Sequence, residues 1–576
     1  MKIRTDFVTN SSSSSFISCS IGSPELADFI KKYKLRLTNK NITGRASMVY
    51  NVPDRVIIGK QNQSDKKQME PNENFLKYFP EVDLPEEKYD SNRSSCLRIG
   101  AYIIIQQMMK ETGIPELLSE YFNDRDLGLF LDLITYTLIC ENNAGQYYPD
   151  YAYNHPLFTE GMRIYSDATV SDFFGRVTDD QSIGFLNEWN AKRDHREKIY
   201  ISYDSTNKNI QAGDVEIAEF GNAKVDIGKP IFNYSIAYDT HNREPLFYEK
   251  YPGSINDVSQ LQIMLDKAMG YGYRKIGFIL DRGYFSKANL DYMDHCGYDF
   301  VVMVKGMSTL VNELILENKG KFEDKRACSI RRHKVYGTTV KRKLFLTDEK
   351  ERYFHIFHSS GKETKERENV EKAVENCAYF LEKKKGSVYE VPNYLQYYFE
   401  PEYSKDGYFL MAREKRDVIE RELRLCGYFV IITSQKMTAG EAIDLYRSRD
   451  ASEKLFRGDK SYLGNKSIRV YSDESVSAKI FIEFVALIIR NRIYTKLRDE
   501  VERLGKDPNF MTVPAAIKEL EKIEIILGLD LVYRLDHAVT ATQKTILKAF
   551  DMDAKYVQEK AKRISEQIRN TSGNEG

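Results

Sequence analysis

The sequence predicts an α/β protein in which a mixed sheet is flanked by helices, preceded by a helical domain and interrupted by a β-rich insertion. Two observations lead to this fold class. The spacing of apolar residues changes from a helical period to strand-like alternation near Lys198. After that point three strand-like segments follow one another as a meander, and later strands alternate with helices, which is typical of a mixed sheet.

Composition sets the limits of this prediction. With 576 residues the chain is too long for a single hydrophobic core, so we expect several domains. Lys plus Arg and Asp plus Glu both number 85, so charge must be examined locally for signs of a nucleic-acid partner. The seven cysteines are scattered without a C-x-x-C pair, which favours a reducing cytoplasm and argues against structural zinc. Because no long apolar run is present, we expect no membrane span.

Two regions precede the sheet. Residues 1–95 are predicted to be an irregular extension and linker, because the stretch containing NQSDKKQMEPNEN is polar and has no period. Residues 96–195 are predicted to form a helical domain. Apolar segments such as IGAYIIIQQMMKETGIPELL have helical spacing there, with Gly and Pro between them.

The sheet is predicted in two parts. Residues 196–310 form the first part, with KIYISYDST, FNYSIAYDT and EPLFYEKYPG in the meander and IGFILD and FVVMVKG in the alternating section. Residues 311–425 are the insertion. Residues 426–520 return to a buried strand, GYFVIITS, and to a helix opened by a capping box in the sequence TAGE. Residues 521–576 are predicted to be a helical tail.

Two carboxylates stand at strand ends. Asp204 follows KIYISY and Asp281 follows IGFIL. Taken alone, each is more simply a turn or cap residue. If the two strands lie side by side, however, their carboxyl ends bring the acids together, and like charges at close range repel. A divalent cation removes this repulsion, and oxygen ligands suit Mg²⁺ or, alternatively, Mn²⁺.

The helix opened by the capping box carries basic and acidic residues close together, with few apolar residues among them. At about 100° per residue, Tyr446, Arg449, Glu453 and Lys460 share one face and extend over about 21 Å. A solvated surface helix is the simpler interpretation of this face. A row of that length also suits an extended polyanion, and Glu453 would complete three carboxylates for a two-metal site of phosphoryl transfer.

These residues resemble a known family. The four residues match in full the YREK signature of a large group of DDE insertion-sequence transposases, in the form Tyr446-x2-Arg449-x3-Glu453-x6-Lys460. YDST around Asp204 is similar to the first-aspartate strand of that family, and ILDRGYFS around Asp281 is similar to its second-aspartate motif. The resemblance covers about residues 96–520.

The resemblance implies a ribonuclease-H-like fold whose β-rich insertion occupies the long gap between Asp281 and Glu453. It also implies that residues 96–195 are a DNA-binding domain, as in bacterial members. The catalytic acids, Asp204, Asp281 and Glu453, would hold two Mg²⁺ ions, and Tyr446, Arg449 and Lys460 would grip phosphates near the transposon end.

The implied reaction is cut-and-paste transposition of an insertion sequence. Water attacks the phosphodiester at the end of the element and leaves a 3′-hydroxyl, which forms a hairpin on the opposite strand and later joins target DNA. No nucleotide cofactor is required. The implied partners are double-stranded DNA, both element ends and target, and a second subunit, because two ends must be cut together. We expect the protein to act in the cytoplasm.

A basic cluster inside the insertion provides a candidate DNA contact. Arg331, Arg332 and Lys334 lie in a stretch with few acids, and phosphate binding needs local positive charge. The alternative is a solvated hairpin with no partner. We predict that this cluster touches DNA.

Three other functions compete with a transposase. A ribonuclease-H-like nuclease would cut DNA without strand transfer. A DNA-binding protein derived from a transposase would bind ends without cutting them. A metal-dependent phosphohydrolase of small molecules ranks last, because a row of donors about 21 Å long would then be superfluous.

Overall fold

The computed structural model describes most of the chain after residue 92. The described residues are 15–20, 48–52, 55–60, 93–193, 198–210, 215–221, 229–255, 257–304, 308–345, 347–449, 467–468, 470, 472–528 and 532–572. They form two compact units. Unit 1 comprises Met1–Asn190, Lys208–Phe232 and Leu455–Gly576, and unit 2 comprises Ala191–Asn207 and Asn233–Lys454.

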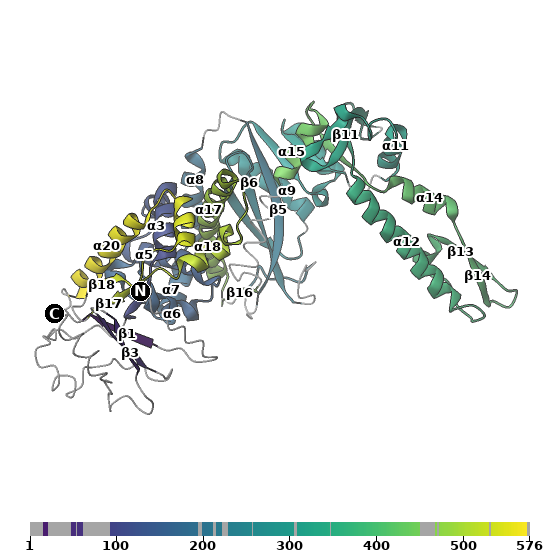
Figure 1. Cartoon of the computed structure of the whole chain (residues 1–576). Coiled ribbons are helices and arrows are strands. Elements are labelled where there is room, and N and C mark those ends of the chain that lie inside the picture. Colours follow the sequence, from purple (N-terminus) through teal and green to yellow (C-terminus); the bar gives the residue numbers. More distant parts are fainter. Residues whose placement is uncertain are drawn as a thin grey trace, which may run out of the picture. The chain divides into compact units, whose positions relative to one another are not determined.

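A large mixed sheet lies mainly in unit 2 (Figure 1). Its strands are β5 (Ile199–Ile210), β6 (Ile231–Asp239), β7 (Glu244–Pro252), β8 (Ile276–Leu280), β9 (Asp299–Met303), β10 (Ser329–Ile330), β11 (Val335–Lys343), β12 (Glu351–His358) and β15 (Tyr428–Thr433), together with β16 (Ser467–Ile468), which pairs with the end of β5. The spatial order is β10-β11-β12-β15-β9-β8-β5-β6-β7. β5, β8 and β9 are parallel, whereas β9, β15, β12 and β11 pair antiparallel. The predicted mixed α/β sheet is therefore confirmed.

The apolar runs of the sequence explain the centre of this sheet. Every residue of β8 is buried, as expected for a strand covered on both faces. Gly277 in β8 is paired with Tyr200 in β5, and a Cβ at Gly277 would lie 2.3 Å from the tyrosine ring. Glycine is therefore needed for the close approach of these two strands. The helices of unit 2 near the sheet are α9 (Asp257–Gly270), α10 (Lys287–His295), α11 (Ser308–Asn318) and α15 (Ala439–Ser448).

The region predicted as an insertion has two different parts. β11 and β12 extend the main sheet through β15, so residues from within the range 311–425 belong to the sheet itself. Residues 360–425 form an arm (Figure 1). The arm consists of α12 (Ser360–Glu382), α13 (Asn393–Gln396), β13 (Phe399–Tyr403), β14 (Phe409–Glu414) and α14 (Arg416–Leu425). The prediction of one separate insertion is thus too wide, because alternating apolar residues in YFHIFH continue the central core.

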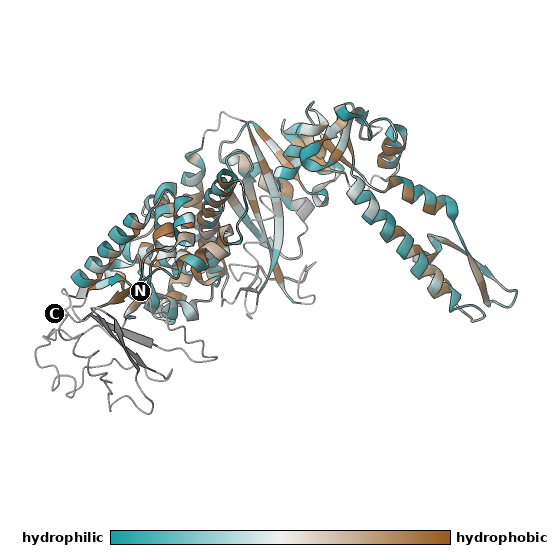
Figure 2. Cartoon of the chain, viewed as in Figure 1, coloured by the Kyte–Doolittle hydropathy of each residue, from teal (hydrophilic) through white to brown (hydrophobic). Residues whose placement is uncertain are grey.

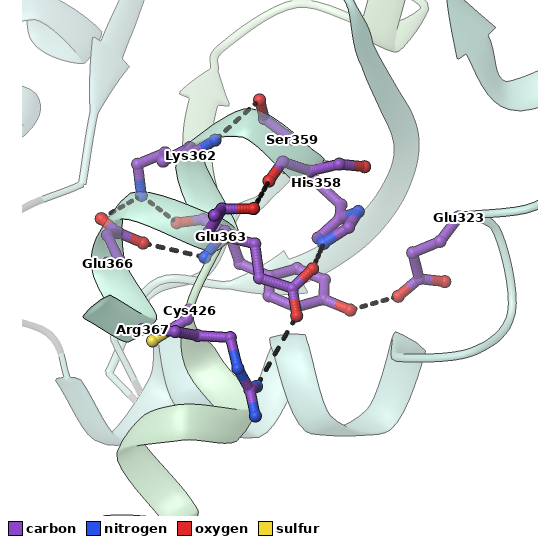
Figure 3. A network of polar contacts seen from close by, with 12 residues as sticks. Glu323, His358, Ser359, Lys362, Glu363, Glu366, Arg367 and Cys426 are labelled. Carbon is purple, nitrogen blue, oxygen red and sulfur yellow. Dashed lines mark hydrogen bonds and ion pairs between the residues drawn. The ribbon is translucent and has the colours of Figure 1, made fainter. Parts of the chain in front are cut away.

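Polar contacts fix the root of the arm (Figure 3). His358, the last residue of β12, contacts Glu363 of α12 at 2.9 Å from Nε2 to Oε2. The N–H of Gly427 donates to Oε2 of Glu366 at 2.8 Å. Gly427 has a φ of +88°, and a Cβ there would lie 2.7 Å from the Cβ of Glu363. The turn from α14 into β15 therefore requires glycine.

Unit 1 is built around α17 (Asp473–Leu504), a helix of 32 residues. The middle of α17 is buried on nearly all sides, from Lys479 to Asn491. Phe481 lies among aromatic rings, with centroid distances of 5.0 Å to Phe130 and 5.3 Å to Phe185. A helix that is apolar all round needs partners on every side. The helices that contact α17 most are α3 (Gly100–Thr112), α5 (Asp124–Cys140) and α7 (Asp167–Arg176).

This packing differs from the prediction that the segment 426–520 belongs as a whole to the sheet domain. α17 lies in unit 1, with the helices of the range 96–195. Figure 2 shows apolar residues gathered where the helices of unit 1 face one another. Among the helices within the described ranges, none has both the length and the apolar character needed to cross a bilayer.

The two ends of the chain also contain strands. The tail predicted as helical holds β17 (Glu524–Leu527) and β18 (Tyr533–Leu535), which form a sheet with β4 (Cys96–Arg98), in addition to α19 (Ala541–Lys548) and α20 (Ala554–Ser572). The segment 1–95, predicted to be irregular, contains a sheet of order β1-β3-β2. These strands are β1 (Ser15–Ser20), β2 (Met48–Val52) and β3 (Arg55–Lys60). The missed signal is the sequence MVYNV-PD-RVIIGK, in which Pro-Asp separates two runs rich in branched residues.

Candidate active site

The carboxyl ends of β5 and β8 meet at one edge of the sheet. The two strands are parallel, and Tyr203 is paired with Leu280. Asp204 follows Tyr203 and Asp281 follows Leu280, so the backbones of the two aspartates lie next to each other. The side chain of Asp204 is outside the described part of the structure.

Asp281 caps a short 3-10 turn, η3 (Arg282–Tyr284). Its Oδ1 accepts the N–H of Arg282 at 2.8 Å. The same oxygen pairs with Nη1 of Arg449 at 3.2 Å. The Asp281 side chain is 38% exposed and the Arg449 side chain is 12% exposed. The acid is thus accessible to a ligand, while its basic partner is held by the protein.

The sequence of α15 explains how Arg449 reaches this edge. Thr438 and Glu441 form the predicted capping box, in which the Thr438 hydroxyl accepts the N–H of Glu441 and the glutamate accepts the N–H of Thr438. Ile443 and Tyr446 then place one face of α15 against the sheet, in a core cluster that includes Ile279 of β8. Residues three or four apart share a helix face. Arg449, three residues after Tyr446, therefore follows the packed face toward the end of β8.

Tyr446 is buried, although the sequence resemblance assigns it a contact with phosphate. The residue is 7% exposed and belongs to the core cluster beneath α15. The guanidinium carbon of Arg449 lies 5.4 Å from the centroid of the Tyr446 ring. In this structure the tyrosine thus packs the helix on the sheet and lies beside the arginine. A phosphate contact by its ring remains a prediction.

The basic cluster of the sheet extension lies near the other side of α15. Asp444 of α15 pairs with Arg332 and, at 2.7 Å, with Nε2 of His333. Arg331 and Lys334 are exposed, and within the described part of the chain neither contacts an acidic side chain. One of the three predicted DNA contacts is therefore already neutralised by an acid. Arg331 and Lys334 keep their charge available.

Two predicted residues fall outside the described residues. Glu453 and Lys460 lie between the end of α15 and β16 (Ser467–Ile468), in the range 450–466. The predicted common face of the helix is therefore untested beyond Arg449.

The residues of this edge fit a hard divalent cation in their chemistry. Asp281 offers carboxylate oxygen at the surface, and the register places a second aspartate beside it. Among the described side chains, no group of three His, Cys, Asp or Glu residues is positioned to hold a metal ion. The side chain of Asp204 and the whole of Glu453 lie outside the described residues.

Sequence reasoning missed two ion pairs of this protein. The first is Arg449 with Asp281, since a signature residue expected on phosphate contacts an acid instead. The second is Lys208 of β5 with Glu483 of α17, both in unit 1 and both almost completely buried. A signal for the second existed: a lysine and a glutamate stand in runs that are otherwise apolar or strand-like, and buried charges need partners.

A comparison with protein families finds a match that includes this edge of the sheet. Residues 203–489, just under half of the chain, match the family described as "Transposase DDE domain". The match begins one residue before Asp204 and includes Asp281 and Arg449. This part of the chain is therefore similar to the DDE domain of transposases, in agreement with the broader resemblance inferred from the motifs. No protein of curated function matches the chain.

Two solved structures are distantly similar. The piggyBac transposase synaptic complex with hairpin DNA has 8% identity and a TM-score of 0.31, over 83% of this chain and 77% of that one. The Mos1 transposase paired-end complex has 11% identity and a TM-score of 0.13, over 40% of this chain and 68% of that one. Both likenesses are weak, and neither defines the fold.

Proposed function

We propose that this protein is a metal-dependent DDE transposase of the YREK-signature group, which moves a bacterial insertion sequence by cut-and-paste transposition. The observation that carries the proposal is the edge of the sheet where Asp204 and Asp281 directly follow the paired residues Tyr203 and Leu280, with Arg449 paired to Asp281. The meander of β5, β6 and β7, followed by β8 and β9 on the other side of β5, supports a ribonuclease-H-like core.

Asp204, Asp281 and Glu453 would hold two divalent cations, Mg²⁺ or Mn²⁺. Bound there, the cations would supply a nucleophilic hydroxide from water and would stabilise the leaving oxygen of the phosphodiester. The sheet contributes rigidity, because two strand ends fix the backbone of two ligands. Such positioning accounts for much of the catalysis of phosphoryl transfer, which requires little covalent chemistry from the protein.

Arg449 has a second role in this proposal. Its guanidinium balances the charge of Asp281 and is held in place by Tyr446 and the α15 core. When a DNA phosphate approaches the cations, the planar guanidinium can donate to phosphate while it stays near the carboxylate. Lys460 and the cluster of Arg331, Arg332 and Lys334 would bind the DNA backbone further along. The helices of residues 96–195 would bind the element ends.

We further propose that the protein acts as a homodimer on DNA in the bacterial cytoplasm. Two ends of one element must be cut and joined together. One active site per end is the simplest arrangement.

The test is cleavage of DNA that carries the element's own ends, taken from the sequence flanking the gene. Wild-type protein would be compared with Glu453→Gln, with Mg²⁺ and with EDTA. Cleavage that requires both the metal and Glu453 would support the proposal. Joining of the cut ends to a target plasmid separates a transposase from a nuclease. Specific binding without cleavage under any metal would instead favour a non-catalytic DNA-binding protein derived from a transposase.

A further inference from the structure

One hairpin turn at the end of the main sheet consists entirely of basic residues. β10 and β11 pair antiparallel, with Ile330 opposite Val335. Four residues between these strands form the basic turn: Arg331, Arg332, His333 and Lys334. The N–H of Lys334 donates to the carbonyl of Arg331 at 3.1 Å, and Lys334 has a φ of +54°. Lysine rarely adopts this left-handed conformation, so the turn is tight and brings its cations close together.

The basic turn is fixed against α15. Val335 is buried and Ile330 is partly buried in the core cluster that also contains Ile443 of α15. The residues on both sides of the turn therefore share a core with the helix. The fold thus determines which side chain of α15 faces the turn.

Asp444 is the acid of α15 that contacts the basic turn. One of its carboxylate oxygens pairs with the guanidinium of Arg332. The other oxygen accepts the Nε2–H of His333 at 2.7 Å. A carboxylate only accepts hydrogen bonds, so the ring nitrogen at this distance carries the proton. Both oxygens of Asp444 are therefore used by the two middle residues of the turn.

The two outer residues of the turn are in a different situation. Arg331 and Lys334 are exposed, and neither is paired with an acid in the described part of the chain. The side chain of Arg332 is also exposed, at 65%, but a phosphate must compete with Asp444 for its guanidinium. Ion pairs at the surface are weak, so a phosphate can displace the carboxylate, at a cost in net affinity.

This difference matters because phosphate contacts are made with DNA of any sequence. Each phosphate that a basic side chain neutralises adds to the affinity and to its dependence on salt. Such contacts carry no sequence information. A protein that acts at particular DNA ends must find them among a large excess of other DNA. An acid that occupies part of a basic turn lowers the competing affinity and leaves the outer cations for DNA.

We propose that Asp444 restrains the sequence-independent binding of DNA by this protein, because it occupies Arg332 and His333, which phosphate would otherwise bind. The inference rests on the proposed function, since it requires that the basic turn meets DNA. Asp444 is not a catalytic residue here. It is a positioning residue that acts only through the side chains of the turn.

The experiment measures binding of the full chain to a duplex of unrelated sequence, in EDTA at about pH 8, over a range of salt concentrations. Asp444→Asn keeps the size of the side chain and removes its charge. We expect the affinity at low salt to rise by about threefold to tenfold. The plot of log affinity against log salt should become steeper by about one, because Arg332 then reaches phosphate freely.

Glu402→Gln on β13 is the matched control. Glu402 is 39% exposed and pairs with Arg413, which is 68% exposed, so this substitution also removes an acid from a surface pair with arginine. Glu402 lies in the arm and not at the basic turn. The affinity of Glu402→Gln for the duplex should stay within about twofold of wild type.

A double variant tests whether Asp444 acts through the basic turn. At about pH 8 a solvated histidine is mostly uncharged, so the gain in affinity should come from Arg332. Asp444→Asn should therefore have little effect on affinity when it is combined with Arg332→Ala. A general disturbance of α15 would instead persist in the double variant.

Unchanged or weaker binding by Asp444→Asn would overturn the inference, as would an equal gain of affinity in the control or in the presence of Arg332→Ala. A wild type that binds no duplex would overturn it as well. The cleavage assay tests the proposed function separately. A protein that cleaves its element ends, but whose affinity does not change in Asp444→Asn, contradicts only this inference. A protein that gains affinity in Asp444→Asn but never cleaves DNA contradicts only the proposed function.

Discussion

Two ion pairs of this protein have the same chemistry and opposite surroundings. Lys208 and Glu483 are 0% and 2% exposed, within unit 1. Arg449 and Asp281 are 12% and 38% exposed, at the edge of the sheet in unit 2. Burial of a charge in low-dielectric surroundings makes its partner indispensable, whereas an exposed acid can exchange its partner for a ligand. From this comparison we expect the first pair to contribute mainly to stability, and we propose that the second pair contributes to function.

Removal of one partner of the buried pair should have the largest effect on stability. Lys208→Met removes the cation that pairs with the buried carboxylate of Glu483, so the free energy of unfolding should fall by about 3–5 kcal/mol. Chemical denaturation followed by circular dichroism measures this change. Lys208→Met combined with Glu483→Leu should recover most of the loss. If the double variant is as unstable as the single variant, the charge is not the cause.

Acidification should destabilise the sheet through a buried histidine. His355 in β12 is completely buried between the hydroxyls of Thr339 and Thr433, each at 2.9 Å, and burial lowers the pKa of His355 to about 4. The unfolded chain binds this proton near its ordinary pKa of about 6.5. The contribution of neutral His355 to the free energy of unfolding is therefore fully present above pH 6.5. As the pH falls toward 4, this contribution decreases by about 3 kcal/mol in total.

Thermal unfolding at several pH values would measure the contribution of His355. His355→Gln keeps polar atoms toward both threonines and cannot titrate, so its stability should depend less on pH in this window. Equal pH dependence in both proteins would rule out His355 as the source.

The capping box of α15 should make a smaller contribution. Thr438→Ala removes the hydroxyl that accepts the N–H of Glu441, and loss of such a cap costs about 1 kcal/mol. Thr438→Ser keeps the hydroxyl and is the control. Because α15 carries Arg449, any loss of DNA cleavage should follow the loss of stability in this pair of variants, and a cleavage defect in Thr438→Ser would contradict the argument.

The exposed pair should contribute least to stability. Asp281→Asn removes the charge of a side chain that is 38% exposed and keeps an oxygen that can accept from Arg449, so the free energy of unfolding should change by less than about 1 kcal/mol. Denaturation under the same conditions as for Lys208→Met provides the comparison. A loss as large as that of the buried pair would show that the two sites do not differ in the way proposed.

The sequence predicted the parts of this protein in which one strong local signal decides the structure. The strands KIYISY and IGFIL, their acids and the capping box of α15 all follow from periodicity and cap chemistry. The location of α17 could not be predicted, because a helix that is buried on nearly all sides requires partners but does not identify them. The pairing of Arg449 with Asp281 joins residues far apart in sequence, and the packing of α15 against the sheet brings them together.

The central claim is that Asp281 at the sheet edge is a functional acid, and one measurement tests it most directly. DNA with the element's own ends would be incubated with Mg²⁺ and with wild type, Asp281→Asn or Asp299→Asn. Asp299 is a matched control, since it is also a partly exposed aspartate paired with a base, Lys198, but it lies at the opposite end of a parallel strand. The account predicts that Asp281→Asn lowers the cleavage rate by at least about a thousandfold at nearly unchanged stability, while Asp299→Asn still cleaves. Cleavage by Asp281→Asn at the wild-type rate would contradict it.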